Sequence, residues 1–438
     1  MKLASFNPFS KTPTNHAGGP THLVDPFVHL DRFLMLGSEG GTYYVSAPKL
    51  TVDNAQNLLR CLKLDGPRTV RGIVEVSEAG RAPRQDPAVF ALAVAACHGD
   101  EATRAEALAA LPRVCRTATH LFQFLETANA GRGWGRALRR AVGDWYGTKD
   151  SKALETQMVK YRRRNDWTHR DALRLSHAKP PTPAHGELYA WSVGKGPAPA
   201  GGQAEAMARL TNETDGTKAA EIVRDFRLPR EAVPTELLRD PFVWEALLTD
   251  MPMTAMIRNL VTMSRVGLLA EGTPEARLVA ARLVDVDRLR RARVHPVALL
   301  MALRTYATGY DTRSGEAWYP AREIVTALNV AFHLSFGTLV PTGKRFVLGL
   351  DVSGSMDSPV AGSRMTCAEG AAAMAMAIVH AEEDVRVMGF ADRFRPLPFE
   401  KGLRLDAALA ITSGLTFGAT DCGLPMRWAR NLKLAIDT

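Results

Sequence analysis

Between about residue 50 and residue 336, apolar residues recur every three or four positions along the chain. This spacing places them on one face of an α-helix, so it predicts a long succession of amphipathic helices. Gly, Pro, Asp or Thr residues separate the segments, as they do at helix ends. The predicted helices cover residues 51–64, 86–98, 104–115, 119–128, 134–146, 240–251, 253–267, 295–309 and 321–336.

These helical segments show no tight sequence repeat. Arrays of paired helices of the HEAT type tolerate this degree of divergence, so we predict a curved α-solenoid. The Gly- and Pro-rich stretch 194–203 is expected to form a surface loop within the array. Residues 41–46 are a candidate short edge strand.

The hydrophobic pattern changes near residue 346. Residues Phe346–Leu350 form a short apolar, partly β-branched run, which is typical of a buried parallel strand. The elements expected after it are a helix at 367–382, a strand at 384–390, a short strand near 394–399 and a helix near 405–411. We therefore predict two domains, a helical repeat over residues 1–340 and an α/β domain over residues 341–438, which opens with the joining segment 341–345.

The loop that leaves the predicted strand carries a candidate metal site. Asp351, Ser353 and Ser355 occupy alternate positions there, and a loop at the carboxyl end of a parallel strand is where open α/β sheets place ligands. One carboxylate and two hydroxyls are hard oxygen ligands suited to Mg²⁺ or Ca²⁺. The alternative interpretation is a Ser-rich loop that caps the following helix. The pattern resembles the metal-ion-dependent adhesion site of a von Willebrand A-type domain.

Domains of this type bring a Thr to the metal from a second loop and an Asp from a third. The resemblance assigns the first role to Thr420, which lies 65 residues after Ser355. The third loop would follow a later strand, which we expect to begin where the sequence ends. Asp437 follows helical sequence and is not assigned that role. The A-type domain is thus expected to be incomplete, and its divalent cation, Mg²⁺ or a similar ion, to be weakly held.

Composition and length are those of an ordinary globular protein of two or more domains, with 438 residues, of which 46% are hydrophobic and 23% charged. The five cysteines are scattered and form no C-x-x-C pair, which argues against a disulfide framework or zinc site and favours a cytoplasmic location. The amino-terminal segment lacks the apolar core of a signal peptide. No apolar run approaches the length of a membrane span.

The net charge of +9 is concentrated in one part of the chain. Residues 131–180 hold 13 Lys and Arg against 5 Asp and Glu, a balance of +8, together with Trp134, Trp145 and Trp167. Clustered basic residues among aromatic ones are the expected footprint of a nucleic-acid ligand. The alternative is a solvated helix face.

Within this stretch, residues 160–180 are the sharpest candidate site. A helix over Leu154–Arg164 would place Lys160 and Arg164 one turn apart on one face. Thr168 is a predicted N-cap for a second helix, with the Asp171 carboxylate at its third position. Arg174 and His177 would share a face of that helix. The predicted unit is a helical hairpin that converges these cationic residues. Trp167 is interpreted as a core anchor at the turn, and the alternative is a stacking platform for a base.

Segments spread over the whole chain resemble the Ro autoantigen family, whose members are RNA-binding proteins defined by the TROVE domain. High Ala and Arg content is typical of a bacterial member. The matching segments are residues 33–55, 160–180, 251–260, 293–309, 341–356 and 418–429. The resemblance implies a closed ring of HEAT-like helices clasped by an A-type domain.

It also implies that small noncoding Y RNA binds the outer surface of the ring, and that single-stranded 3′ ends of misfolded RNA enter its hole. By motif alignment, the RNA-contacting Lys, Arg and His of the family fall on Lys160, Arg164 and His177. The neighbouring candidates for RNA contact are Arg162, Arg163, Arg170 and Arg174. Arg258 is a candidate lining residue of the hole, and the alternative for its segment is packing against neighbouring helices. Family members act in RNA quality control and decay, with Y RNA tethering a ring exoribonuclease, and a monomer without a membrane partner is expected.

Two other classes of protein compete with this interpretation. An enzyme is disfavoured because 337–345 lacks the spacing and the Ser/Thr of a phosphate-binding loop, and because Ser353 and Ser355 lack a nucleophile-elbow pattern. A metal-dependent adhesion-type scaffold without RNA recognition predicts evenly spread basic charge, whereas the charge is clustered.

Overall fold

A computed structural model describes residues 24–38, 47–311, 315–360, 364–413 and 420–438. The candidate strand at 41–46 lies outside these residues, as do parts of the matching segments 33–55 and 418–429. The described chain falls into two compact units. Unit 1 comprises Met1–Asn212 and Leu228–Val233, and unit 2 comprises Glu213–Arg227 and Pro234–Thr438. Within the described ranges, no helix is both long and apolar enough to cross a membrane.

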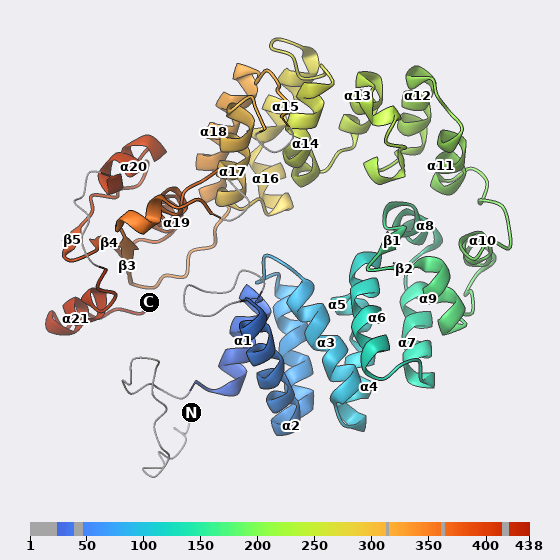
Figure 1. Ribbon diagram of the computed structural model, residues 1–438, viewed down its shortest axis with the longest axis horizontal. Coiled ribbons are helices and arrows are strands. Elements are labelled where there is room, and N and C mark those ends of the chain that lie inside the picture. The colour runs from blue at the N-terminus through green and yellow to red at the C-terminus, as the bar shows by residue number, and fades with distance from the viewer. Residues whose placement is uncertain (1–23, 39–46, 312–314, 361–363, 414–419) are drawn as a thin grey trace. The chain divides into compact units, whose positions relative to one another are not determined.

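Unit 1 is built from helices that pack against helices next to them in sequence or up to three helices away (Figure 1). Its helices are α1 (Pro26–Leu36), α2 (Ala47–Ala79), α3 (Asp86–His98), α4 (Glu101–Ala109), α5 (Leu111–Val114), α6 (Ala118–Gly131), α7 (Arg136–Gly147), α8 (Ser151–Lys160), α9 (His169–Ser176), α10 (Pro183–Ser192) and α11 (Gln203–Thr211). Two short strands, β1 (Arg163–Arg164) and β2 (Trp167–Thr168), join α8 to α9. The predicted surface loop at 194–203 lies between α10 and α11.

Polar side chains define where these helices begin. At the start of α8, the carboxylate of Asp150 accepts a hydrogen bond from the backbone N–H of Ala153 at 2.8 Å. Asp100 caps α4 in the same way through Thr103, also at 2.8 Å. Such caps satisfy backbone donors that the helix itself leaves unpaired.

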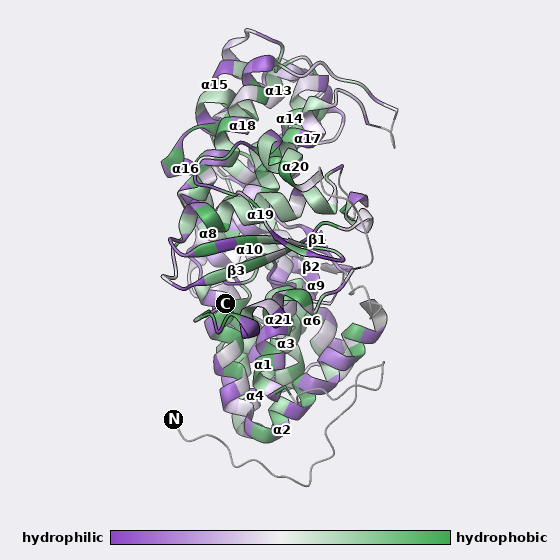
Figure 2. Ribbon diagram, turned by 90° about the vertical axis from the view of Figure 1, so that its left-hand side faces the viewer, coloured by the Kyte–Doolittle hydropathy of each residue, from purple (hydrophilic) through white to green (hydrophobic). Residues whose placement is uncertain are grey.

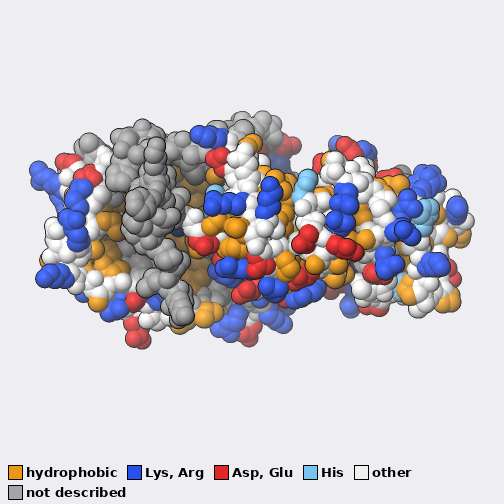
Figure 3. Space-filling model, turned by 90° about the horizontal axis from the view of Figure 1, so that it is seen from below, with side chains coloured by type: hydrophobic (Ala, Val, Ile, Leu, Met, Phe, Trp, Pro, Cys, Tyr) orange, Lys and Arg blue, Asp and Glu red, His pale blue; other side chains and the backbone are white. Residues whose placement is uncertain are grey.

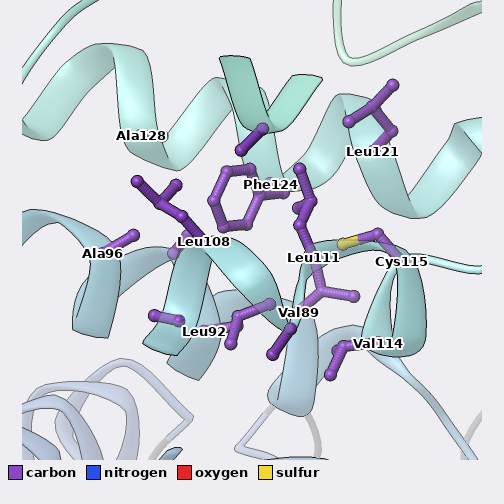
Figure 4. Close-up of a cluster of buried hydrophobic side chains, with 14 of the residues drawn as sticks. Val89, Leu92, Ala96, Leu108, Leu111, Val114, Cys115, Leu121, Phe124 and Ala128 are labelled. Atoms are coloured by element: carbon purple, nitrogen blue, oxygen red, sulfur yellow. The ribbon is translucent and has the colours of Figure 1, made fainter. Parts of the chain in front are cut away.

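The core of unit 1 runs from α1 to α10, and Figure 4 shows the part of it between α3, α4, α5 and α6. Helix α3 is apolar on nearly all sides, because it is covered by neighbours in every direction. Figure 2 shows that the other helices carry both hydrophobic and hydrophilic residues along their lengths. Labelled members of the core cluster are Val89, Leu92, Ala96, Leu108, Leu111, Val114, Cys115, Leu121, Phe124 and Ala128.

Unit 2 begins with further helices and ends in a small α/β domain. Its helices are α12 (Gly216–Phe226), α13 (Pro241–Thr249), α14 (Met253–Arg265), α15 (Pro274–Leu283), α16 (Val286–Ala292), α17 (Pro296–Ala307), α18 (Arg322–Phe336), α19 (Cys367–Ala381), α20 (Leu405–Ser413) and α21 (Leu424–Asn431). Strands β3 (Phe346–Asp351) and β4 (Val385–Phe390) are parallel neighbours, and β5 (Phe394–Pro396) pairs antiparallel with β4.

The α/β domain of unit 2 is fixed to the last helices of the repeat. The guanidinium of Arg304 on α17 lies 2.6 Å from the Glu369 carboxylate in the first turn of α19. The carboxylate of Glu382, just after α19, accepts hydrogen bonds from the backbone of Thr342 and Gly343 at 2.7 and 3.0 Å. The two hydrogen bonds to Glu382 hold the segment that joins α18 to β3 against the end of α19.

The predicted fold class, a helical repeat followed by an A-type α/β domain, is confirmed in both parts. The predicted strand and helix boundaries in residues 346–411 differ from the observed ones by a few residues at most. The helix expected over Leu154–Arg164 was predicted too long, because the observed helix ends at Lys160. Asn165 and Asp166 adopt positive φ values of 50° and 58°, which form a tight two-residue hairpin turn in place of the helix end.

We predict that the stability of the folded protein depends on pH through His169. Burial lowers the pKa of this imidazole from 6.5 to about 4. Between these values the unfolded chain binds a proton that the folded chain does not. The free energy of unfolding should therefore fall as the pH drops from 6.5 to 4, by about 1 kcal/mol for each pH unit.

Denaturant unfolding measured across this pH range tests the prediction. His169→Gln should reduce the pH dependence without abolishing it, because burial also lowers the pKa of His120 to about 4. The same substitution at the exposed His98 is the control. Equal pH profiles for the wild type and the His169 variant would contradict the assignment.

Candidate nucleic-acid interface and metal centre

The β1–β2 hairpin is an exposed cationic projection beside α6 and α9 (Figure 1). Its turn is anchored because the side-chain amide of Asn165 donates a hydrogen bond to the Glu126 carboxylate on α6. Arg163 pairs with Asp166 across the turn at 2.6 Å. Arg164 lies on β1 and Lys160 at the end of α8, so the expectation that they share one helix face is corrected. Arg162 and Arg164 are exposed.

Helix α9 presents the second group of predicted cations. Its start is the predicted capping box, in which the backbone N–H of Thr168 donates to the Asp171 carboxylate at 3.0 Å and Asp171 N–H donates to the Thr168 hydroxyl. Arg170 and Arg174 are exposed and one turn apart. His177, also exposed, is the C-cap residue with φ of 53° and ψ of 38°, in the left-handed region. It therefore lies just beyond the helix and not on its face.

His177 lies beside cations that the sequence prediction did not single out. A groove of about 660 Å³ runs between α7 and the segment that joins α9 to α10. Arg139 and Arg140 of α7 line one side, and His177 and Lys179 line the other. The two arginines belong to the basic stretch 131–180, but their partners across the groove depend on tertiary packing.

Buried aromatic contacts hold α7 and α9 together beneath this surface. The hydroxyl of Tyr146 on α7 lies 2.8 Å from Nδ1 of His169 on α9, and both side chains are buried. Trp145 donates its indole N–H to the carbonyl of Cys115. The ammonium of Lys149 lies 3.7 Å from the centre of the Trp145 ring, and burial lowers the pKa of Lys149 to about 8.

The remaining predicted contact residues occupy different environments. Lys160 is half-buried, with its ammonium 5.4 Å from the centre of the Tyr161 ring. Trp167 is half-buried, packs against the unit 1 core and contacts the Trp134 ring. Arg258 lies exposed on α14, in unit 2. Figure 3 shows Lys and Arg side chains over much of the visible face with acidic ones among them, so surface charge in that view is not confined to one patch.

The metal-site candidates lie at the carboxyl edge of the small sheet. Asp351 ends β3, and its carboxylate accepts a hydrogen bond from the backbone N–H of Ser353 at 2.8 Å. The hydroxyls of Ser353 and Ser355 are 2.9 Å apart. A cavity of about 210 Å³ adjoins this loop and is lined by Asp351, Ser353, Thr366 and Glu369, among others.

Thr420 approaches the same edge from the second loop. The backbone N–H of its neighbour Asp421 donates to the carbonyl of Ala391 at 2.9 Å, immediately after β4. Strand β4 ends at Phe390, whose register partner on β3 is Asp351. Thr420 itself is exposed. The structure thus brings both predicted loops to one edge of the sheet.

The donor set fits a hard divalent cation. One carboxylate and three hydroxyls, from Asp351, Ser353, Ser355 and Thr420, are oxygen ligands of the kind that Mg²⁺ and Ca²⁺ prefer. Within the described ranges, no group of three His, Cys, Asp or Glu side chains could hold a metal.

Asp437 lies at the other end of β3 from this site. It pairs with Arg345, with oxygen–nitrogen distances of 2.8 and 3.0 Å, and these hydrogen bonds hold the pKa of its carboxyl well below the ordinary value. The backbone N–H of Val347 donates to the carbonyl of Thr438 at 3.1 Å. Asp437 is thereby committed to a structural ion pair.

A helical repeat followed by an A-type domain with a D-x-S-x-S loop is the domain arrangement expected of a TROVE-type protein. The TROVE domain model matches residues 13–195 and 203–309, and the Ro60 vWA domain model matches residues 345–438. The chain belongs to the TROVE-domain family, which includes the Ro60 proteins.

Individual relatives agree with this assignment over nearly the full chain. The RNA-binding protein RO60 of Deinococcus radiodurans is 37% identical over 100% of this chain and 85% of its own length. The RNA-binding protein RO60 of Caenorhabditis elegans is 33% identical over 97% of this chain and 78% of its own. The crystal structure of the Deinococcus radiodurans RO (RSR) protein covers 94% of this chain and 85% of its own, with a TM-score of 0.84 and 37% identity.

We predict that Asp351 is essential for any divalent cation held at this site, because it is the one carboxylate among the four expected ligands. Asp351→Asn should lower the affinity for Mg²⁺, or for Mn²⁺ used as a paramagnetic probe, by at least about tenfold. Titration calorimetry or Mn²⁺ resonance would measure the loss.

Asp384→Asn is the matched control, since Asp384 is exposed and directly precedes β4, at the opposite edge of the sheet from the candidate site. RNA binding should survive in both variants, because the cationic surface of unit 1 is a separate element. Unchanged cation affinity in the Asp351 variant would remove the metal site from the account.

Proposed function

We propose that this chain binds RNA through the exposed cationic surface of the β1–β2 hairpin, α9 and the groove beside α7. The single observation that carries the proposal is the placement of Arg164, Arg170, Arg174 and His177 as exposed side chains on one continuous stretch of unit 1. Phosphate oxygens are the natural partners of such arginines, which bind them in a bidentate manner. Two relatives named RNA-binding protein RO60 support the proposal.

The preferred ligand on this surface is a small structured noncoding RNA of the Y RNA type. A folded RNA presents closely spaced phosphates. The β1–β2 hairpin, α9 and the groove beside α7 offer cations at several positions where these phosphates could bind. Lys160, Arg162 and Arg163 contribute at the rim. Arg163 contributes less charge, because Asp166 neutralises it.

The proposal extends to a second mode of RNA binding. We infer that the helical units close into a ring and that single-stranded 3′ ends of misfolded or structured RNA enter its hole, past residues such as Arg258. Binding in the hole would depend on the RNA phosphate backbone and on the RNA being single-stranded. It would not depend on the base sequence. The protein would serve RNA quality control and decay as a cytoplasmic, non-enzymatic monomer, with Y RNA tethering a ring exoribonuclease.

The A-type domain would supply a cation-dependent contact. With Mg²⁺ bound, the site offers a Lewis-acidic position for an acidic group of a partner. Asp351 would hold the ion, and Ser353, Ser355 and Thr420 would orient it. The Arg304–Glu369 ion pair joins the first turn of α19 to the helical repeat. This contact would help to hold the neighbouring D-x-S-x-S loop in place.

We predict that removing two cations from α9 weakens RNA binding and reduces its dependence on salt. Arg170→Gln with Arg174→Gln should flatten the slope of log affinity against log salt by about 1–2, since each phosphate contact contributes about 0.7–0.9. Gel shifts of a structured small RNA over a range of salt concentrations would measure the slope.

The control removes the same charge from unit 2, with Lys218→Gln and Arg224→Gln on the exposed side of α12. That variant should keep the slope of the wild type. If both double variants behaved alike, bulk charge and not this surface would explain binding.

We predict that the second mode requires a free single-stranded 3′ end. One hairpin RNA would be compared in three forms: blunt, with a short 3′ overhang, and with the overhang covered by a complementary strand. With saturating Y RNA present, the overhang form should bind tightly, because a duplex end cannot enter a narrow passage. Equal affinity of all three forms would leave a binder of outer-surface RNA without threading.

A further inference from the structure

Two tryptophans and an arginine are gathered on one side of the β1–β2 hairpin. Arg164 and Trp167 are register partners on the two strands, so their side chains stand next to each other on the same face of the ribbon. The Trp167 ring lies 5.9 Å from the Trp134 ring, at an interplanar angle of 39°. Both residues are half-buried.

This pair differs from the deeply buried tryptophans of the same chain. Trp145, Trp244 and Trp318 each donate their indole N–H to a backbone carbonyl and are at most 5% exposed. The indole N–H of Trp134 is covered yet has no hydrogen-bond partner. Buried indoles usually find such a partner. Trp134 is therefore held by packing alone.

The residues next to the pair, Gly133 and Arg164, border open space. Trp134 follows Gly133, which adopts a φ of 70° and would meet no atom within 4 Å if it carried a Cβ. Across the hairpin, Asp166 neutralises Arg163. Among the described residues Arg164 makes no ion pair, so its guanidinium is available to an anion beside the rings.

We propose that Trp167 and Trp134 form a stacking site for one unpaired nucleobase, with Arg164 binding the adjoining phosphate. The inference rests on the proposed RNA-binding function and adds the kind of nucleotide recognised at the hairpin. Every base offers a π-face to an indole, whereas bases within a duplex are already stacked on their neighbours. The site would therefore select a loop, bulge or single-stranded end.

Binding of a short single-stranded oligoribonucleotide to the full chain tests this site. Trp167→Leu should lower the affinity about tenfold with an unchanged salt slope, because it removes stacking and no charge. Trp167→Phe should retain most of the affinity, since a ring remains. Trp191→Leu is the matched control, because Trp191 is also half-buried against the unit 1 core, on α10.

An abasic scan of the same oligoribonucleotide makes the test independent of folding defects in the variants. For the wild-type protein, removing one particular base should cause about the same tenfold loss. The Trp167→Leu variant should be indifferent to that removal. Equal losses in the Trp167 and Trp191 variants, or a wild-type protein insensitive to every abasic position, would overturn the stacking site. Failure of the proposed function itself would look different, since the wild type would then bind no RNA.

Discussion

The buried contact between the Tyr146 hydroxyl and the His169 ring supports the whole cationic surface of unit 1. It joins α7 to the first residue of α9 at 2.8 Å, and both side chains are buried from bulk solvent, which strengthens the hydrogen bond. The next residue, Arg170, already points to solvent. The position of α9, and of the groove that His177 and Arg139 share, follows from this contact. A neutral imidazole at this point costs less to bury than a charged one, which is why the pKa of His169 is low.

In the A-type domain, the corresponding constraint is the register between β3 and β4. The pairing of Asp351 with Phe390 fixes the position along the strands at which the D-x-S-x-S loop leaves the sheet. The Asp421–Ala391 hydrogen bond brings the Thr420 loop to the same height. Backbone hydrogen bonding, and not the ligand side chains themselves, therefore positions the candidate cation site.

Parts of the structure could be predicted from sequence where a local physical rule decides the outcome. Helix α3 matches its predicted range, because an uninterrupted apolar run between Pro87 and Gly99 admits few alternatives. The capping box of Thr168 and Asp171 was predicted from the spacing of two residues alone. The turn between β1 and β2 was missed, because Lys160 and the arginines after it favour a helix, whereas the positive φ values of Asn165 and Asp166 depend on packing against α6. The groove at His177 required knowledge of which residues face α7 across space.

Photocrosslinking of RNA to the full chain, with the crosslinked peptides identified by mass spectrometry, tests the central claim most directly. The account predicts that a structured small RNA crosslinks within residues 134–179, with the strongest signals in peptides of the hairpin and α9. Crosslinks that fall outside this stretch, at yields equal to or above those within it, would contradict the assignment of the RNA surface.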